Sequence, residues 1–274
     1  MYNYKYYHIE RETFMELITS RNNETVKRAA ALKDAAERRE KGLFLLEGAR
    51  LCADAANSAV QIEQAFFTES ALQKYTEECK SIQSVAKRDF CVADSVALRL
   101  ADTKNPQGVF CVCKTLDKTH NIDKIKYNGI YALTDGVQNP DNLGALARTA
   151  EALGADGLLL CGGCDLYNPK AMRASMGSLL RLDVFEADDA PALVRTLQSK
   201  GMRVFASVVS GDARPVQDVP KGEGCVVVIG NEGNGVSDEV RDAADERITI
   251  PMAGRAESLN AAAAAAILLW EFLK

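Results

Sequence analysis

Short apolar runs alternate with helical patterns through the first half of this chain. Between the runs, apolar residues recur at helical spacing over residues 49–56 and 70–79. Strands alternating with helices predict an α/β domain, which we place at residues 19–115. The predicted strands are residues 43–46, 62–68, 89–93 and 108–113.

The second half of the chain repeats the alternation of strands and helices. Strands without a polar face predict a parallel sheet covered on both sides, over residues 129–274. Asn142 is expected to cap the first helix, and Gly154 to end it. Residues 116–128 read as a linker because they are charged and lack apolar periodicity. The predicted strands are residues 130–134, 157–161, 182–185, 203–209 and 225–229, and the predicted helices near 142–153, 169–178 and 190–200.

The amino-terminal end is less regular. Residues 1–18 are rich in tyrosine and charge, and we expect an extension that docks loosely, with an amphipathic turn near 10–18. Residues 21–50 contain eight Lys or Arg against five Asp or Glu and predict one helix that runs to Lys41. Such a run is usually a solvated helix face, and the alternative is a surface that contacts phosphates.

Composition narrows the class of protein. The 274 residues carry a formal charge of −5, so no overall basic field attracts nucleic acid. The first residues do not have the pattern of a signal peptide, and the longest apolar stretch, 261–270, is too short for a membrane helix. We therefore expect a cytoplasmic protein.

Eight cysteines, several of them inside apolar runs, indicate reduced thiols in a core. Cys161 and Cys164 have the spacing of a metal or redox motif, but a zinc site needs two further ligands. The chain's histidines are His8 and His120. We favour a strand end that turns through two glycines, and we expect no metal.

The stretch 225–260 contains the features that predict a binding pocket. An apolar strand ends at the turn Gly230–Gly235, a second short run ends at Pro251 and Met252, and Asn260 opens an Ala-rich helix. Backbone groups of two strand ends and a helix start then meet, as in small-ligand pockets of parallel sheets. The glycine spacing fits neither a P-loop nor a dinucleotide fingerprint.

Arg148 follows the first strand of this domain and has two readings. It either pairs with Glu151, three residues on, or serves as a cation near the pocket. The domain contains no histidine, so it suggests no Ser-His-Asp or Cys-His pair.

Four blocks of the sequence stand out by their order and spacing: residues 139–150, 170–177, 229–237, and 250–252 with 258–260. Together these blocks resemble the SpoU (TrmH-type) RNA ribose methyltransferases of the SPOUT superfamily. The last block departs slightly, because Ala261 and Ala262 stand where many members carry Val-Ser. Residues 19–115 are similar to the family's substrate-binding domain, most clearly at Phe44–Gly48.

The resemblance implies a parallel-sheet α/β domain with a deep trefoil knot, a homodimer, and S-adenosylmethionine as cofactor. It implies methyl transfer to a ribose 2′-hydroxyl of structured RNA, ribosomal RNA in preference to transfer RNA. The implied cofactor contacts, made largely through the backbone, are Ser207, Gly230, Ile250, Met252 and Leu259.

The resemblance also implies a catalytic set. Arginine stays protonated, so we expect Arg148 to stabilise developing oxyanion charge or to clamp a phosphate rather than to take a proton. Glu232 and Asn260 are expected to orient the arginine and the ribose, and Asn142 to cap its helix and contact the site. The basic segment then becomes an expected RNA contact. The implied catalytic set is Arg148, Glu232, Asn260, Asn142 and Ser258.

Two other functions compete with this interpretation. A non-catalytic RNA-binding or ribosome-assembly factor would keep the fold without cofactor binding. A nucleotide-dependent oxidoreductase is disfavoured by the glycine spacing. The sequence leaves open which RNA is modified, and whether Arg148 acts within its own chain or across a dimer.

Overall fold

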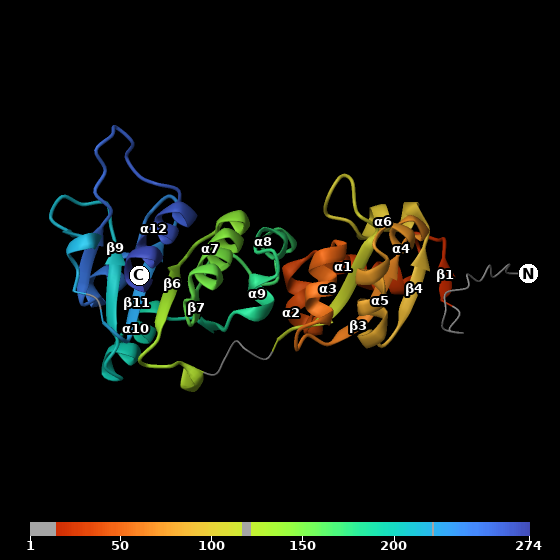
Figure 1. The fold of residues 1–274 in the computed structure, drawn as a ribbon, viewed down its shortest axis with the longest axis horizontal. Coiled ribbons are helices and arrows are strands. Elements are labelled where there is room, and N and C mark those ends of the chain that lie inside the picture. Colours follow the sequence, from red (N-terminus) through yellow and green to blue (C-terminus); the bar gives the residue numbers. More distant parts are fainter. Residues whose placement is uncertain (1–14, 117–121, 221) are drawn as a thin grey trace, which may run out of the picture. The chain divides into compact units, whose positions relative to one another are not determined.

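The computed structural model describes residues 15–116, 122–220 and 222–274 (Figure 1). Residue contacts divide the chain into two compact units. Unit 1 comprises the described residues before Asp117 together with Tyr167–Arg173, and unit 2 comprises the rest. The segment Tyr167–Arg173, which we expected in the second domain, thus belongs to unit 1.

Unit 1 is built on a five-stranded sheet in the order β1-β4-β3-β5-β2. Strand β5 runs antiparallel to its neighbours β3 and β2, whereas β1, β4 and β3 pair in parallel. The strands are β1 (Glu16–Ile18), β2 (Leu43–Glu47), β3 (Ile62–Phe67), β4 (Asp89–Val92) and β5 (Val109–Lys114). The helices are α1 (Glu24–Ala31), α2 (Ala35–Lys41), α3 (Ala49–Ala56), α4 (Glu69–Lys74), α5 (Thr76–Val85) and α6 (Asp94–Leu100).

The amino-terminal end differs from the sequence prediction in two places. Residues 1–14 of the expected extension lie outside the described residues, but Glu16–Ile18 form strand β1 on β4, so the boundary at residue 19 is too late. The single basic helix is wrong as well, because Asp34 caps a second helix by accepting from Ala36 N at 2.7 Å. The buried Arg38 donates to the carbonyls of Leu32 and Lys33, which end α1, at 2.8 Å each.

Unit 2 contains a seven-stranded sheet, all parallel, in the order β10-β12-β9-β11-β6-β7-β8. The predicted parallel sheet is therefore confirmed. The strands are β6 (Ile130–Asp135), β7 (Gly157–Cys161), β8 (Val184–Ala187), β9 (Arg203–Ser207), β10 (Arg214–Pro215), β11 (Cys225–Gly230) and β12 (Glu246–Thr249). The helices of unit 2 are α7 (Pro140–Leu153), α9 (Ser178–Arg181), α10 (Ala190–Ser199), α11 (Asp238–Ala243) and α12 (Ala261–Leu273), with short 3-10 turns η1 (Ile122–Lys124) and η2 (Val216–Asp218). Helix α8 (Pro169–Ala174) lies, except for its last residue, in the segment that belongs to unit 1.

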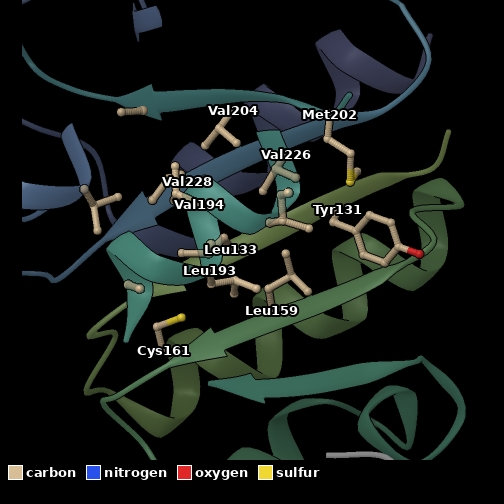
Figure 2. Close-up of a cluster of buried hydrophobic side chains, with 14 of the residues drawn as sticks. Tyr131, Leu133, Leu159, Cys161, Leu193, Val194, Met202, Val204, Val226 and Val228 are labelled. Carbon is tan, nitrogen blue, oxygen red and sulfur yellow. The ribbon is translucent and has the colours of Figure 1, made fainter. Parts of the chain in front are cut away.

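Helices cover both faces of this sheet, as the strand pattern predicts. On one face, alternate residues of β6, β7, β9 and β11 pack against α10 and Val240 of α11 in a buried core (Figure 2). On the other face lie α7 and α12, which pack against each other, and Phe272 of α12 meets Phe205 with ring centroids 4.9 Å apart. Burying aliphatic side chains on both faces stabilises the central strands, by about 25 cal/mol for each Å² removed from water.

The end of the expected linker belongs to unit 2. Residues 117–121 lie outside the described residues, but Ile125 is buried in the core of unit 2, and Lys126 N donates to the Tyr131 hydroxyl at 2.9 Å. The trefoil knot that the resemblance implies stays a prediction. In the described part of the chain, no helix combines the length and the apolar character needed to cross a bilayer.

Strand β11 sets the position of the site. It pairs with β6 on one side and β9 on the other, so that Gly230 stands opposite Asp135. The carboxyl ends of β6, β9, β11 and β12 therefore meet at one edge of the sheet, where ligands of open α/β sheets bind.

Candidate active site

Helix α7 starts at this edge, and its cap corrects the sequence prediction. Asn139, not Asn142, is the N-cap, and its side chain accepts from Asp141 N at 2.9 Å. Pro140 occupies the first turn, where the missing N–H costs nothing. Asn142 therefore lies inside the helix, with only 6% of its surface exposed, and its amide is available to other elements. Gly154 ends the helix in the left-handed conformation, with φ 85°, as predicted.

The turn after β11 is closed by its own asparagine. Asn231 and Gly235 exchange backbone hydrogen bonds of 2.9 Å, and the Asn231 side chain accepts from Gly233 N and Asn234 N at 2.9 and 3.1 Å. Its Nδ2 donates to Gly136 O at 2.8 Å and ties the turn to the end of β6. At Gly230, a Cβ would stand 2.1 Å from the carbonyl carbon of Gly235, so this position accepts glycine alone.

Glu232, at the tip of this turn, faces the start of α7. Its carboxylate accepts from Gln138 N at 3.0 Å, from Asn139 N at 2.9 Å and from Asn142 Nδ2 at 2.9 Å. Burial raises the pKa of Glu232, but these hydrogen bonds outweigh it, and the pKa of the carboxyl lies below its usual value. Glu232 is thus ionised at neutral pH and largely saturated with donors.

Asn260 completes the arrangement from the start of α12. Its Oδ1 accepts from Ala262 N and Ala263 N at 3.0 and 3.2 Å, which makes it the N-cap of α12. Its Nδ2 donates to Asn142 Oδ1 at 2.8 Å. Two side-chain hydrogen bonds therefore join Glu232, Asn142 and Asn260. The bonded residues are far apart in the sequence, 90 positions for Asn142 and Glu232 and 118 positions for Asn142 and Asn260. We call these three residues the polar network.

Arg148 lies outside the polar network. It is exposed and makes no hydrogen bond or ion pair with the residues that the structure describes. The expected partner, Glu151, binds Arg181 instead, with contacts of 2.5 and 2.8 Å. Arg148 follows Asn142 by six positions, about 9 Å along the helix axis and about 120° around it. The structure therefore gives no contact by which Glu232 or Asn260 would orient Arg148.

The expected cofactor contacts line the edge of the sheet. Ser207, at the end of β9, donates its hydroxyl to Val228 O at 2.6 Å. After β12, Ile250 and Met252 are half-buried, and Leu259 is 38% exposed. Ser258 is exposed, and its hydroxyl has no partner among the described residues. Within the same described set, the backbone groups of residues 251–259 make no hydrogen bond.

The cysteine motif has a plain structural explanation. Cys161 ends β7, the chain turns through Gly162 and Gly163 at φ 64° and 82°, and Cys164 N donates to Val137 O at 2.8 Å. Neither cysteine forms a disulfide, and the Cys164 thiol donates to Asp165 O at 3.5 Å. Burial raises the pKa of Cys161 to about 12, so its thiol stays protonated. His8 and His120 lie outside the described residues, and within those residues no cluster of three potential ligands could hold a metal.

Several residues of the site escaped the sequence analysis. The backbone N–H groups of Gln138 and Asn139 hold Glu232, and Asp135 accepts from Ser237 N at 2.7 Å at the opposite end of the turn. The Asn-Pro pair at 139–140 is itself a helix-start signal and could have located the cap. Backbone donors that serve a distant carboxylate leave no signal in the sequence.

Comparison with known proteins shows which family the chain resembles. A model of the SpoU rRNA Methylase family matches residues 129–270, and a model of the MRM3-like substrate binding domain matches residues 23–111. The chain is 30% identical over 257 residues to the 23S rRNA (guanosine(2553)-2'-O)-methyltransferase RlmP of Bacillus subtilis, covering 93% of this chain and 98% of that protein. It is 29% identical over 273 residues to a 23S rRNA (uridine(2479)-2'-O)-methyltransferase of Streptomyces viridochromogenes, covering 97% and 94%.

Solved structures agree with these matches. An AdoMet-bound rRNA methyltransferase from Sinorhizobium meliloti superimposes with a TM-score of 0.83 at 28% identity, covering 94% of this chain and 97% of that one. The SpoU methyltransferase AviRb from Streptomyces viridochromogenes, in complex with AdoMet, gives 0.80 at 27% identity, covering 92% and 98%. The predicted fold class is confirmed by these likenesses.

Proposed function

The chain belongs to the SpoU rRNA methylase family, and on that premise we propose that it transfers a methyl group from S-adenosylmethionine to a ribose 2′-hydroxyl of ribosomal RNA. The observation that carries the proposal is the polar network, because it joins three separate family blocks through two side-chain hydrogen bonds. Two relatives, which this chain matches over nearly their whole length, are named as methyltransferases of a ribose 2′-oxygen in 23S rRNA.

The residues at the sheet edge fit the cofactor. The segment 251–259 offers backbone donors and acceptors that no described residue uses, and a nucleoside needs such groups for its base and ribose. Met252 and Leu259 supply apolar surface beside them, and Val209, after β9, is 65% exposed. We assign cofactor binding to this segment, together with Ser207 and the backbone at Gly230.

When bound, S-adenosylmethionine supplies a methyl group on a sulfonium, which is already electrophilic. The chain's own task is then to hold the 2′-oxygen in line and to lower the cost of its deprotonation. Glu232 has little free acceptor capacity, so it acts as a fixed negative group that positions the α7 start, with Asn142 and Asn260. Ser258 and Asn260, two positions apart just before α12, are assigned to contact the ribose.

Arg148 supplies the positive charge that this network lacks. A guanidinium stabilises charge that develops on the 2′-oxygen, or clamps the neighbouring phosphate through two parallel hydrogen bonds. Because Arg148 faces solvent without a partner among the described residues, RNA or a second subunit has free access to it.

We also propose a homodimer that forms through α12. Ala263, Ile267 and Trp270 are spaced at i, i+4 and i+7 and form one exposed apolar stripe, with Ile267 41% and Trp270 56% exposed. A second copy that covers this stripe would bring another α7 close to the site, and Arg148 would then act across the dimer. We propose the cytoplasm as the location of the protein, because ribosomal RNA is the proposed substrate.

The test of the catalytic assignment is Arg148→Ala. We expect methyl transfer to protein-free 23S rRNA to fall by about 100-fold or more, as when one oxyanion-stabilising donor is lost. Calorimetry should find the affinity for S-adenosylmethionine unchanged. The matched control is Arg195→Ala, since Arg195 is likewise exposed and without a partner among the described residues, but lies on α10.

Normal turnover by Arg148→Ala would overturn the role of this arginine. A wild-type chain that binds rRNA but no S-adenosylmethionine would instead be a non-catalytic RNA-binding factor.

A further inference from the structure

In unit 1, a loop between α6 and β5 is held in place by an unusual number of side chains. This anchored loop, Ala101–Gly108, receives its main support from Glu47, which is only 8% exposed. The Glu47 carboxylate accepts from Asp102 N at 2.8 Å, from Thr103 N at 3.3 Å and from the Thr103 hydroxyl. A buried carboxylate is costly unless it is fully paired, and here it is paired with loop backbone.

Three further side chains fix the anchored loop from other directions. Lys33 donates to Arg99 O and Ala101 O at 2.7 and 2.6 Å, and burial lowers the pKa of this lysine. Gln107 accepts from Ala49 N at 2.8 Å and so ties the loop to the start of α3. Arg173, in the segment that folds with unit 1, donates to Asp102 Oδ2 at 2.6 Å. The loop contributes Ala101 to the hydrophobic core of unit 1, and its other described residues are not part of that core. These hydrogen bonds therefore serve mainly to fix the conformation of the loop.

The tip of the anchored loop makes no use of its own side chains. Lys104 and Asn105 are exposed and have no partner among the described residues. The same holds for Arg50 in the first turn of α3, directly after the residue that Gln107 binds. Side chains on a loop that is already immobilised lose little backbone entropy on binding, which is how recognition loops gain affinity.

The charge at this edge of unit 1 is uneven. The anchored loop leads into β5, and Arg50 follows β2, the neighbouring strand at the edge of the sheet. The exposed acids Glu69 and Asp94 follow β3 and β4, progressively further across the sheet. Elsewhere in the basic amino-terminal segment, Lys27 pairs with Glu24 and Lys41 with Glu40. Lys104 and Arg50 therefore place positive charge on the β2–β5 side, and Arg99 of α6, two residues before the loop, adds a further exposed guanidinium without a partner among the described residues.

We propose that the anchored loop and Arg50 form the surface by which unit 1 recognises an unpaired segment of ribosomal RNA, with Lys104 and Arg50 on phosphates and Asn105 on the edge of a base. Lysine and arginine make the phosphate contacts that position RNA, and an amide pairs with donor and acceptor groups of an exposed base edge. Glu47 is a positioning residue for this surface. The inference rests on the proposed function, because it identifies how the same substrate is selected.

The test uses the full chain and 23S rRNA transcribed in vitro, which carries no modification. Lys104→Ala should weaken rRNA binding about fivefold and reduce the slope of log K against log salt by about 0.7 to 0.9, the value for one phosphate contact. Asn105→Ala should weaken binding by about tenfold without changing that slope, since it removes a base contact. Both variants should raise KM for rRNA and leave kcat and S-adenosylmethionine affinity within twofold.

Lys114→Ala is the matched control, because Lys114 is an exposed lysine at the opposite end of β5, about 20 Å from the loop. Glu47→Gln should raise KM for rRNA at unchanged kcat and accelerate amide hydrogen exchange at Asp102 and Thr103. A general loss of stability would not confine faster exchange to these two amides.

Three outcomes are distinguishable. If wild-type protein methylates the rRNA and the Lys104 and Asn105 variants bind it with unchanged affinity, the loop proposal is wrong and the proposed function stands. Equal losses in Lys114→Ala would likewise overturn it. If wild-type protein binds the rRNA without methylating it, the proposed function fails, and the binding data still decide the role of the loop.

Discussion

The side chain of Asn142 links Glu232 to Asn260, and replacing it by aspartate tests the polar network most directly. Asn142 donates to the Glu232 carboxylate at 2.9 Å and accepts from Asn260 Nδ2 at 2.8 Å. Asn142→Asp keeps the size of the side chain and the acceptor for Asn260, but places a second carboxylate oxygen against Glu232. Asn142→Ala removes both hydrogen bonds and adds no charge.

The two variants should lose different amounts of stability at pH 7. The alanine variant loses two hydrogen bonds, one of them to a charged acceptor, or about 2 kcal/mol. The aspartate variant loses one bond, about 1.5 kcal/mol, and gains repulsion between like charges. At 4 Å this repulsion is between about 1 kcal/mol in water and about 4 kcal/mol at an effective dielectric constant of about 20. Because Glu232 is exposed, the repulsion lies in the lower part of this range. The lost bond and the repulsion together destabilise the aspartate variant by about 3 kcal/mol.

The order of the two variants should reverse with pH. In the wild type the pKa of Glu232 is lowered, so its contribution is present above the unfolded value and lost as pH falls through the folded one. Two facing carboxyls instead share a proton, which raises a folded-state pKa above the unfolded value. The deficit of Asn142→Asp is then fully present above that raised pKa and shrinks as pH falls. The deficit of Asn142→Ala should stay constant between pH 5 and pH 8.

Urea unfolding followed by tryptophan fluorescence measures the free energy of unfolding of unit 2 at each pH, because Trp270 is the single tryptophan and lies in α12 of this unit. Protein concentration must be the same throughout, since a dimer would shift the apparent stability. We expect Asn142→Asp to be the less stable variant at pH 7 and the more stable one near pH 4.5. Parallel stability curves for the two variants over this range would refute the contact between Asn142 and Glu232.

Two further predictions concern the turn and the dimer. Gly230→Ala should destabilise unit 2 by about 3 kcal/mol in the same unfolding assay, because its Cβ would meet the Gly235 backbone at 2.1 Å. Gly233→Ala is the control, since its Cβ would meet only a side-chain oxygen at 3.5 Å. This control should change the stability by less than about 1 kcal/mol. Trp270→Glu should halve the mass found by light scattering after size-exclusion chromatography, and Val85→Glu, a charge placed on an exposed apolar residue of unit 1, should leave that mass unchanged.

Elements that a local pattern determines were predicted well. Strand β11 lies where uninterrupted apolar residues predict it, since a strand buried on both faces has no polar alternation. Gly154 was recognised because positive φ is a requirement of a single position. The start of α12 was recognised from the polar cluster Ser258–Asn260, within which Asn260 is the cap. The family blocks located the polar network for the same reason: each block is continuous in sequence.

Two local features and one long-range feature were missed. Asn139 and Asn142 have equal capping propensity, and Pro140, whose fixed φ suits the first helical turn, decides between them. The split of the basic helix at Asp34 is likewise local, but the charge run concealed it. The transfer of Tyr167–Arg173 to unit 1 depends on contacts such as Tyr167 against Phe44, with ring centroids 4.5 Å apart, and periodicity carries no information about such pairs.

We propose that the polar network and Arg148 have separate roles in the reaction. Each member of the network is fixed by backbone groups: Glu232 by two N–H donors, Asn260 by the first turn of α12, and Asn142 by its place within α7. Such a network is preorganised and contributes position, but Glu232 is ionised at neutral pH and committed to three donors, which makes it a poor proton acceptor. A pH dependence of methyl transfer above neutrality must therefore come from the 2′-hydroxyl and its surroundings. Of the expected catalytic residues, Arg148 alone carries a positive charge, and we propose that RNA or another subunit completes the site around its exposed helix face.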